Sequence, residues 1–159
     1  MKYTFGKGGF LKKEKDVSVY NNSTNNAKLA VYEGRLFVLR TWPSDAWLYI
    51  CEVNPDTLVS ISNWIKIRQY TSDSTTYPGT IVHGKYLYIV GGIDPGSGTS
   101  VPSTNISRVD LSGTLSSSSI SKSWATLSSG TDNPVLCVHD GYLLVYGGYD
   151  YSKNPLTKL

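Results

Sequence analysis

The sequence predicts an all-β protein built from repeated strand-turn-strand units, and two observations support this fold class. Residues 77–94 and 133–150 are near-copies, because the second stretch follows the first after 56 residues (133 − 77) without a gap and matches it at eight positions. The chain of 159 residues is also rich in Tyr (12) and Gly (15), and only 17% of it is charged. Tyr favours strands and Gly favours turns. The identical pairs are Pro78/Pro134, Val82/Val138, His83/His139, Tyr86/Tyr142, Leu87/Leu143, Gly91/Gly147, Gly92/Gly148 and Asp94/Asp150.

The middle repeat shows the strand order of one unit. Two short apolar runs are joined by a tight turn at Gly84-Lys85, and a long polar loop follows Gly91-Gly92. The expected strands are Thr80–His83, Tyr86–Val90, Asn105–Leu111 and Ser123–Leu127. A repeat of about 40–55 residues with this strand content is typical of a β-propeller blade.

An earlier repeat aligns with the middle one at a shift of 51 residues (82 − 31), since 31–39 matches 82–90. We expect its third strand at Ala46–Val53 and its outer strand at Asn63–Ile67. Two further strands are expected near the N-terminus, at Lys2–Phe5 and Asp16–Asn21. The predicted divisions are an N-terminal segment (1–26), two blades (27–70 and 77–128) and a partial blade (133–159).

A doubled glycine followed by a lone tryptophan characterises these repeats. Gly91-Gly92 precedes Trp124, and Gly147-Gly148 stands at the same place in the next repeat. This pattern resembles the kelch repeat over residues 27–150, although Arg40-Thr41 replaces the glycine pair of the first repeat, where Trp64 is retained. The resemblance implies a propeller of four-stranded antiparallel blades, a scaffold that hosts many functions. We expect the glycines to allow a backbone turn that is costly for other residues, and Trp64 and Trp124 to be buried between blades.

The repeats amount to about three blades, whereas propellers have about four to eight. Residues 1–26 could supply the missing third and fourth strands of the last blade. Two explanations stay open: a symmetric dimer that forms a six-bladed ring, or a chain that is part of something longer. Exposed strand edges template unwanted pairing, so either solution would have to cover them.

The loops after the second strands and before the first strands are expected to open on one face. Aromatic rings beside carboxylates and Arg suit the binding of a peptide or a sugar. The predicted ligand-binding residues are Arg40, Trp42, Asp45, Tyr77, Asp94, Tyr149, Asp150 and Tyr151. Tyr70, Asp132 and Asn133 lie in the same expected loops. Asp94 and Asp150 follow the glycine pairs directly, so we also expect them to accept hydrogen bonds from nearby backbone amides.

No catalytic residue, metal or cofactor is predicted. His83 and His139 are the two histidines and share a repeat position, but a metal site needs three or four ligands and no Cys, Asp or Glu joins them. No G-x-S-x-G elbow and no phosphate-loop spacing is found. Cys51 and Cys137 are expected on distant strands, as free and buried thiols.

The composition excludes some classes of partner and leaves the compartment open. A net charge of +3 without a basic stripe argues against nucleic-acid binding, and no apolar stretch is long enough for a membrane span. No secretory signal is visible, free thiols indicate an intracellular protein, and the Ser- and Tyr-rich composition indicates a surface protein. The first prediction is a non-catalytic binding module for a protein or glycan. The alternatives are a sugar-acid-handling enzyme of the kelch-like type, and a structural or assembly component of a cell or virion surface.

Overall fold

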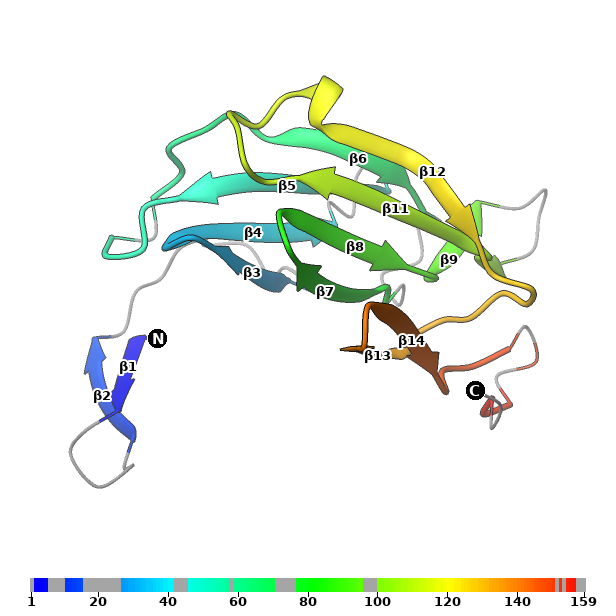
Figure 1. Ribbon diagram of the computed structural model, residues 1–159. Coiled ribbons are helices and arrows are strands. Elements are labelled where there is room, and N and C mark those ends of the chain that lie inside the picture. Colours follow the sequence, from blue (N-terminus) through cyan, green and yellow to red (C-terminus); the bar gives the residue numbers. More distant parts are fainter. Residues whose placement is uncertain are drawn as a thin grey trace.

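The computed structural model of the chain describes residues 2–5, 11–15, 27–41, 46–57, 59–70, 77–95, 100–150, 152 and 154–156. This part of the chain is almost entirely antiparallel β-structure, and its helical content is one 3₁₀ turn at Ser117–Ser119. No helix in these ranges is long and apolar enough to cross a membrane. Figure 1 shows the sheets stacked on one another, with both complete sheets seen from the side.

The first complete sheet, blade 1, has the strand order β3-β4-β5-β6. Its strands are β3 (Lys28–Tyr32), β4 (Arg35–Thr41), β5 (Trp47–Val53) and β6 (Ile65–Gln69). A two-residue turn joins β3 to β4, and both of its residues have positive φ, 47° at Glu33 and 75° at Gly34. This turn geometry matches the right-handed twist of the paired strands, so it fixes their register.

The second complete sheet, blade 2, repeats the same order as β7-β8-β11-β12. Its strands are β7 (Gly79–His83), β8 (Tyr86–Val90), β11 (Asn105–Asp110) and β12 (Ile120–Thr126). The outer strand begins three residues before the predicted Ser123, because Ser121 and Ile120 pair with β11 beyond a bulge. The loop predicted after Gly92 also contains a small hairpin, β9 (Ile93–Pro95) with β10 (Ser100–Pro102).

Two further hairpins stand on either side of the complete blades in the chain order. One joins β13 (Val135–His139) to β14 (Tyr142–Tyr146), and the other joins β1 (Lys2–Phe5) to β2 (Leu11–Lys15). The inner strands β3, β7 and β13 lie side by side in that order, as expected for blades arranged around an axis. The predicted all-β fold of four-stranded antiparallel blades is therefore confirmed, while the strand expected at residues 16–21 lies outside the described residues.

The main hydrophobic core lies between blade 1 and blade 2. Alternate residues of each strand point to this core, because side chains of a strand alternate between the two faces of its sheet. Phe37 and Leu39 of β4 belong to the same buried cluster as Leu87 and Ile89 of β8, and all four side chains are at most 1% exposed. The blades thus pack face to face through apolar side chains.

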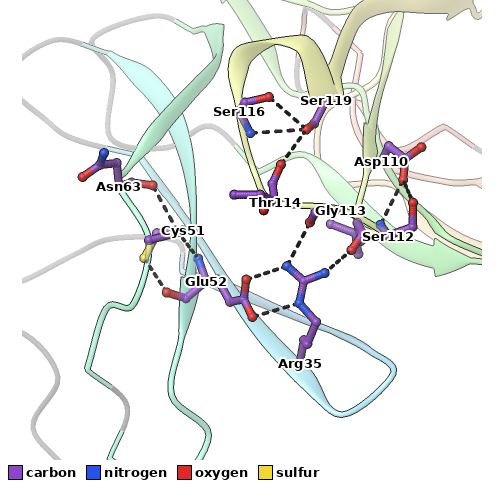
Figure 2. Close-up of polar contacts among 12 residues, drawn as sticks. Arg35, Cys51, Glu52, Asn63, Asp110, Ser112, Gly113, Thr114, Ser116 and Ser119 are labelled. Carbon is purple, nitrogen blue, oxygen red and sulfur yellow. Dashed lines mark hydrogen bonds and ion pairs between the residues drawn. The ribbon is translucent and has the colours of Figure 1, made fainter.

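Arg35 connects the two blades at the end where β4 begins (Figure 2). Its guanidinium group donates to both carboxylate oxygens of Glu52, at 2.9 and 2.6 Å, and to the carbonyl oxygens of Leu111 (2.5 Å) and Gly113 (3.0 Å) in blade 2. The hydrogen bonds from Arg35 lower the pKa of the Glu52 carboxyl. The carboxylate therefore holds Arg35 in the orientation in which it binds the loop between β11 and β12.

The glycine pairs form the backbone corners that the sequence predicted. Gly91 and Gly92 have φ values of 70° and 91°, and Gly147 and Gly148 have 66° and 86°, a region that side chains rarely allow. A Cβ atom at Gly91 would also collide with the carbonyl oxygen of Thr131. The glycines therefore serve two purposes, since they set the turn and let the loop before β13 approach closely.

Two burial predictions are wrong, and both concern the third sheet. Trp124 is 43% exposed, with its ring edge-on to Tyr88 at a centroid distance of 5.1 Å, because the β13–β14 sheet has two strands and contacts the inner strand of blade 2. Cys137 is free but exposed, since it lies on the face of β13 that points away from blade 2. Cys51 is buried as expected, and Trp64 packs partly buried against Val38, Cys51 and Val53.

Replacing Gly91 by alanine should lower the free energy of unfolding by at least about 1–3 kcal/mol, because the backbone is left-handed there and Thr131 leaves no room. Gly113→Ala is the matched control, since a Cβ at Gly113 meets nothing within 4 Å. Urea unfolding monitored by tryptophan fluorescence measures both. Equal stability of the two variants would contradict this account of the glycine corner.

The Arg35–Glu52 pair should make stability depend on pH. Because the folded-state pKa of Glu52 is lowered, the pair stabilises the fold above the carboxyl's unfolded-state pKa, and this contribution is lost as the pH falls through the folded-state value. Between about pH 6 and about pH 3, the unfolding midpoint of the wild type should fall further than that of Glu52→Gln. Glu33→Gln, at an exposed turn residue, should keep the wild-type pH dependence.

Candidate functional site

The loops that follow β8, β12 and β14 gather at one end of the stacked sheets, on the right of Figure 1. We call the described residues of these loops the rim; they are 91–95, 100–104, 127–134 and 147–156 without 151 and 153. Antiparallel blades of equal strand order place equivalent loops at the same end. The prediction that these loops share a face agrees with this arrangement.

Asp94 is held at the rim by a buried arginine. Arg68, at 7% exposure, pairs through Nη2 with the Asp94 carboxylate and with the Ser103 hydroxyl group. Its Nη1 donates to the carbonyl oxygen of Asn105 at 3.5 Å, and the guanidinium carbon lies 5.1 Å from the centre of the Tyr70 ring. Asp94 keeps 36% of its side chain exposed, so its carboxylate is fixed on one side and open to solvent on the other.

Tyr70 supports this arrangement from below the surface. Its ring is 1% exposed, and its hydroxyl group donates to the carbonyl oxygen of Gly91 at 3.4 Å. Burial raises the pKa of the Tyr70 phenol, so the group stays neutral near pH 7. Tyr70 therefore acts as a rigid support for Arg68 and does not form part of an accessible binding surface.

Thr131 joins the corners of blade 2 and of the third sheet. Its carbonyl oxygen accepts a hydrogen bond from the Gly92 amide (2.9 Å), and its hydroxyl group donates to the Gly147 carbonyl oxygen (3.0 Å). Its own amide donates to the Ser103 carbonyl oxygen at 3.1 Å. Because Ser103 also contacts Arg68, the polar contacts form one continuous network across the rim.

Asp132 extends this network toward the third sheet. Its Oδ1 accepts a hydrogen bond from the Tyr77 amide at 2.9 Å. Its backbone pairs in both directions with Tyr149, at 3.1 and 2.8 Å. Tyr149 is 44% exposed, so the pairing fixes an aromatic ring at the surface beside a carboxylate.

Asp150 accepts hydrogen bonds within its own loop. The Asn154 amide donates to Oδ1 at 2.8 Å, and the Asn154 side chain donates to Oδ2 at 3.2 Å. The bond from the Asn154 backbone amide lowers the pKa of the Asp150 carboxyl, and the bond from its side chain adds to this effect. The predicted backbone hydrogen bond is thus confirmed at Asp150, whereas the carboxylate of Asp94 pairs with Arg68.

The structure brings four of the predicted ligand-binding residues into one network: Tyr77, Asp94, Tyr149 and Asp150. Arg40 lies elsewhere, at 3% exposure on the side of blade 1 that faces away from blade 2, with its guanidinium carbon 5.4 Å from the Trp64 ring. Trp42, Asp45 and Tyr151 lie outside the described residues.

Sequence reasoning missed Arg68, Ser103, Thr131 and Asn154, which hold the carboxylates and corners in place. Arg68 lies on an outer strand, where an alternating charged residue usually points to solvent. Its partners Asp94 and Ser103 are 26 and 35 residues away in the sequence. The repeat itself marks Thr131 weakly, because it stands just before the Asn133-Pro134 start of the third repeat.

Histidines and metal ligands do not contribute to the rim. His83 and His139 end the inner strands β7 and β13 at the opposite end from the rim, and both are exposed. His139 contacts the Asp140 carboxylate at 3.4 Å. The described ranges contain no group of three or more His, Cys, Asp and Glu side chains that could hold a metal ion.

The rim offers carboxylates in different surroundings next to an aromatic ring. Asp94 is neighboured by a cation, Asp132 by a backbone amide, and Asp150 by an asparagine. Carboxylates accept hydrogen bonds from hydroxyl groups, and an exposed tyrosine ring offers a large rigid contact area. The arrangement can therefore bind a hydroxyl-rich ligand and can place charged oxygen atoms beside it.

Comparisons with solved structures identify the architecture. YjhT superposes with a TM-score of 0.59 at 14% identity, over 86% of this chain and 37% of that chain. The phage phi92 endosialidase gives 0.56 at 17% identity, over 91% of this chain and 25% of that chain. The Bacteroides ovatus xyloglucan PUL protein GH43B gives 0.50 at 14% identity, over 86% and 32%. The chain spans about a quarter to a third of the length of these proteins, all of which are of β-propeller type.

The chain has a β-propeller fold. No family model matches it. No curated protein matches it either. At the identities above, the structural likeness establishes the fold and does not distinguish kelch repeats from other propeller blades.

The comparisons also correct the first functional prediction, a non-catalytic binding module. The neighbours whose names state an activity are an endosialidase and a glycoside hydrolase, GH43B, and both are glycan-acting enzymes. The prediction came from Tyr-rich loops without an enzymatic motif. Such an absence carries little weight in a propeller, because catalytic carboxylates come from separate blades and leave no local motif.

Replacing Arg68 by alanine should lower the free energy of unfolding by about 2–3 kcal/mol, because Asp94 and Ser103 lose their shared partner. The expected loss is below that of a fully buried pair, since Asp94 is partly exposed. Gln69→Ala, at the exposed neighbouring position, should change stability little. Thermal unfolding by circular dichroism tests this, and an equal effect of both substitutions would rule out the proposed role of Arg68.

Proposed function

We propose that this chain is part of a glycan-acting enzyme of the propeller type and that the rim contacts the sugar. The observation that carries the proposal is the rim network, which places Asp94, Asp132 and Asp150 at one end of the blades beside the exposed Tyr149. The endosialidase and GH43B neighbours support the same class of substrate. This proposal corresponds to the enzymatic alternative drawn from the sequence.

Glycoside hydrolysis generally uses two carboxyl groups, one as an acid and one as a base or nucleophile. Asp150 fits the second role, because its lowered pKa keeps it ionised at neutral pH. We assign Asp132 as its partner, since backbone pairing between Asp132 and Tyr149 places the two carboxyl-bearing residues on adjacent segments. Asp94, which is neutralised by Arg68, is assigned to binding sugar hydroxyl groups.

We further propose that the blades are of the kelch type. The doubled glycines at 91–92 and 147–148 both form left-handed corners, as the pattern requires. Trp64 precedes the outer strand of blade 1, and Trp124 lies within the outer strand of blade 2. The resemblance concerns the scaffold, and it leaves the proposed activity to the rim.

The test is turnover of a panel of sialylated, arabinose-containing and xylose-containing oligosaccharides, with products separated by chromatography. At least one substrate should be converted, and Asp150→Asn and Asp132→Asn should each reduce the rate by about 10²-fold or more. Asp110→Asn is the matched control. Asp110 also has a lowered pKa, of about 2, caused chiefly by hydrogen bonds from Lys85 and Ser112, but it lies at the opposite end of blade 2.

Conversion of no glycan in the panel would contradict the proposed activity. An equal loss in Asp110→Asn would show that the effect is not specific to the rim. Circular dichroism spectra of all three variants should match that of the wild type, which separates a loss of chemistry from a loss of folding.

A further inference from the structure

The two hairpins outside the complete blades occupy complementary positions in the repeat. In blades 1 and 2 an inner hairpin (β3–β4, β7–β8) is followed by an outer hairpin (β5–β6 or β11–β12). A connection then leads from the outer strand to the next inner strand, over residues 70–78 and 127–134. The β1–β2 hairpin precedes β3 through a similar connection, 16–27, so it stands where an outer hairpin belongs, whereas β13–β14 is an inner hairpin.

Both ends of the stacked sheets carry exposed apolar side chains. On the side of blade 1 away from blade 2, Leu29 is 67% and Val31 is 60% exposed. On the side of β13–β14 away from blade 2, Val135 is 67%, Leu144 is 41% and Tyr146 is 48% exposed. Apolar side chains grouped in this way mark an interaction surface.

The open face of blade 1 matches one half of the interface that is already closed. Val31 pairs with Leu36 across β3 and β4, just as Val82 pairs with Leu87 across β7 and β8. Val82 and Leu87 pack against blade 1 in the main core. Blade 1 therefore presents outward the kind of surface that blade 2 presents to it.

The open face of β13–β14 matches the other half of this interface. Cys137 pairs with Leu144, just as Ala30 pairs with Phe37 across β3 and β4. Ala30 and Phe37 are the residues of blade 1 that pack against blade 2. The two open faces are thus equivalent to the two halves of one blade-to-blade contact, so each is shaped to receive the other.

We propose that a second copy of this chain covers both faces. The β13–β14 face of one copy packs on the open face of blade 1 in its partner. The partner's β1–β2 hairpin then pairs with the free edge of β14, which in the described residues pairs with β13 alone. In the complete blades the equivalent edges of β4 and β8 are occupied by β5 and β11.

Two such contacts, related by a twofold axis, close the ring. Each copy contributes two complete blades and two half-blades, so the dimer has six blades, which lies within the range of about four to eight for known propellers. One copy would give three blades and three copies nine, and both numbers lie outside that range. A head-to-tail contact between unlike faces yields a closed ring when the rotation fits, and a filament otherwise.

The completed blade also accounts for the exposed ring of Trp124. Trp124 lies beside Arg108 and Tyr88 on the face of blade 2 that looks toward the third sheet, with the guanidinium carbon of Arg108 5.2 Å from the Trp124 ring. In blade 1 the position equivalent to Arg108 is Glu52, which is part of the contact with the next blade. The outer strands of a completed third blade would cover this surface.

Solution mass gives the first test, measured by light scattering on the full chain. The proposal predicts twice the chain mass of 17.5 kDa (2 × 17.5 = 35 kDa). A monomer at the same concentration would overturn the proposal. A broad distribution above the dimer mass would overturn the closed ring in favour of an open filament.

A cysteine cross-link tests the geometry of the contact. Repeat equivalence places Val31 of one copy opposite Cys137 of the other, so Val31→Cys should give a covalent dimer on a non-reducing gel after mild oxidation. Val31 is exposed in the single chain, so the substitution should leave folding intact. The dimer band should vanish in the double variant with Cys137→Ser.

Thr57→Cys is the matched control, because Thr57 is also exposed on blade 1 but lies in the loop between β5 and β6. It should give at most a background level of cross-linked product. Cross-linking of Val31→Cys no stronger than that of Thr57→Cys would overturn the proposed contact, even if the protein were dimeric. The result is independent of any glycan activity, so it can fail or succeed separately from the proposed function.

Discussion

The apolar contact between facing blades is the interaction on which the rest of the structure depends. Phe37, Leu39 and Ile50 of blade 1 share one buried cluster with Leu87, Ile89 and Val109 of blade 2. Full burial of one such side chain contributes about 1.5–3 kcal/mol. A single four-stranded sheet has no partner for these side chains, so a blade is stable only beside another blade. The same constraint explains why apolar side chains remain at both ends of the stack, where a further sheet is needed.

This packing determines the polar chemistry at both ends of the blades. At one end it places Arg35 and Glu52 against the loop of the next blade, where their hydrogen bonds add direction to a contact that is otherwise non-directional. At the other end, the glycine corners bring the loop before β13 close enough for Thr131 to join Gly92 and Gly147. The rim is therefore rigid because it is built on the blade interface, and rigid placement of carboxylates is what a sugar-acting site requires.

Much of the local structure was predictable from the sequence. Period-two apolar runs and tight turns identified the strands of both complete blades, with boundaries that differ by a few residues, and the doubled glycines indicated left-handed corners. Of the candidate site, the repeat positions of Asp94 and Asp150 and the loop that carries Asp132 were identified correctly as lying at one end. These features depend on residues close in the chain, so local pattern is sufficient to predict them.

The sequence by itself determined the strand order, the repeat and the turns, because each is encoded within one unit of the chain. Only the tertiary structure decided which side chains are buried and which polar groups pair. Arg68 meets Asp94 across 26 residues, Cys137 is exposed although it reads as a core residue, and Trp124 is left partly open. Each outcome depends on whether a neighbouring sheet is present on a given face. That is a property of how blades stack, and no residue within a single blade specifies it.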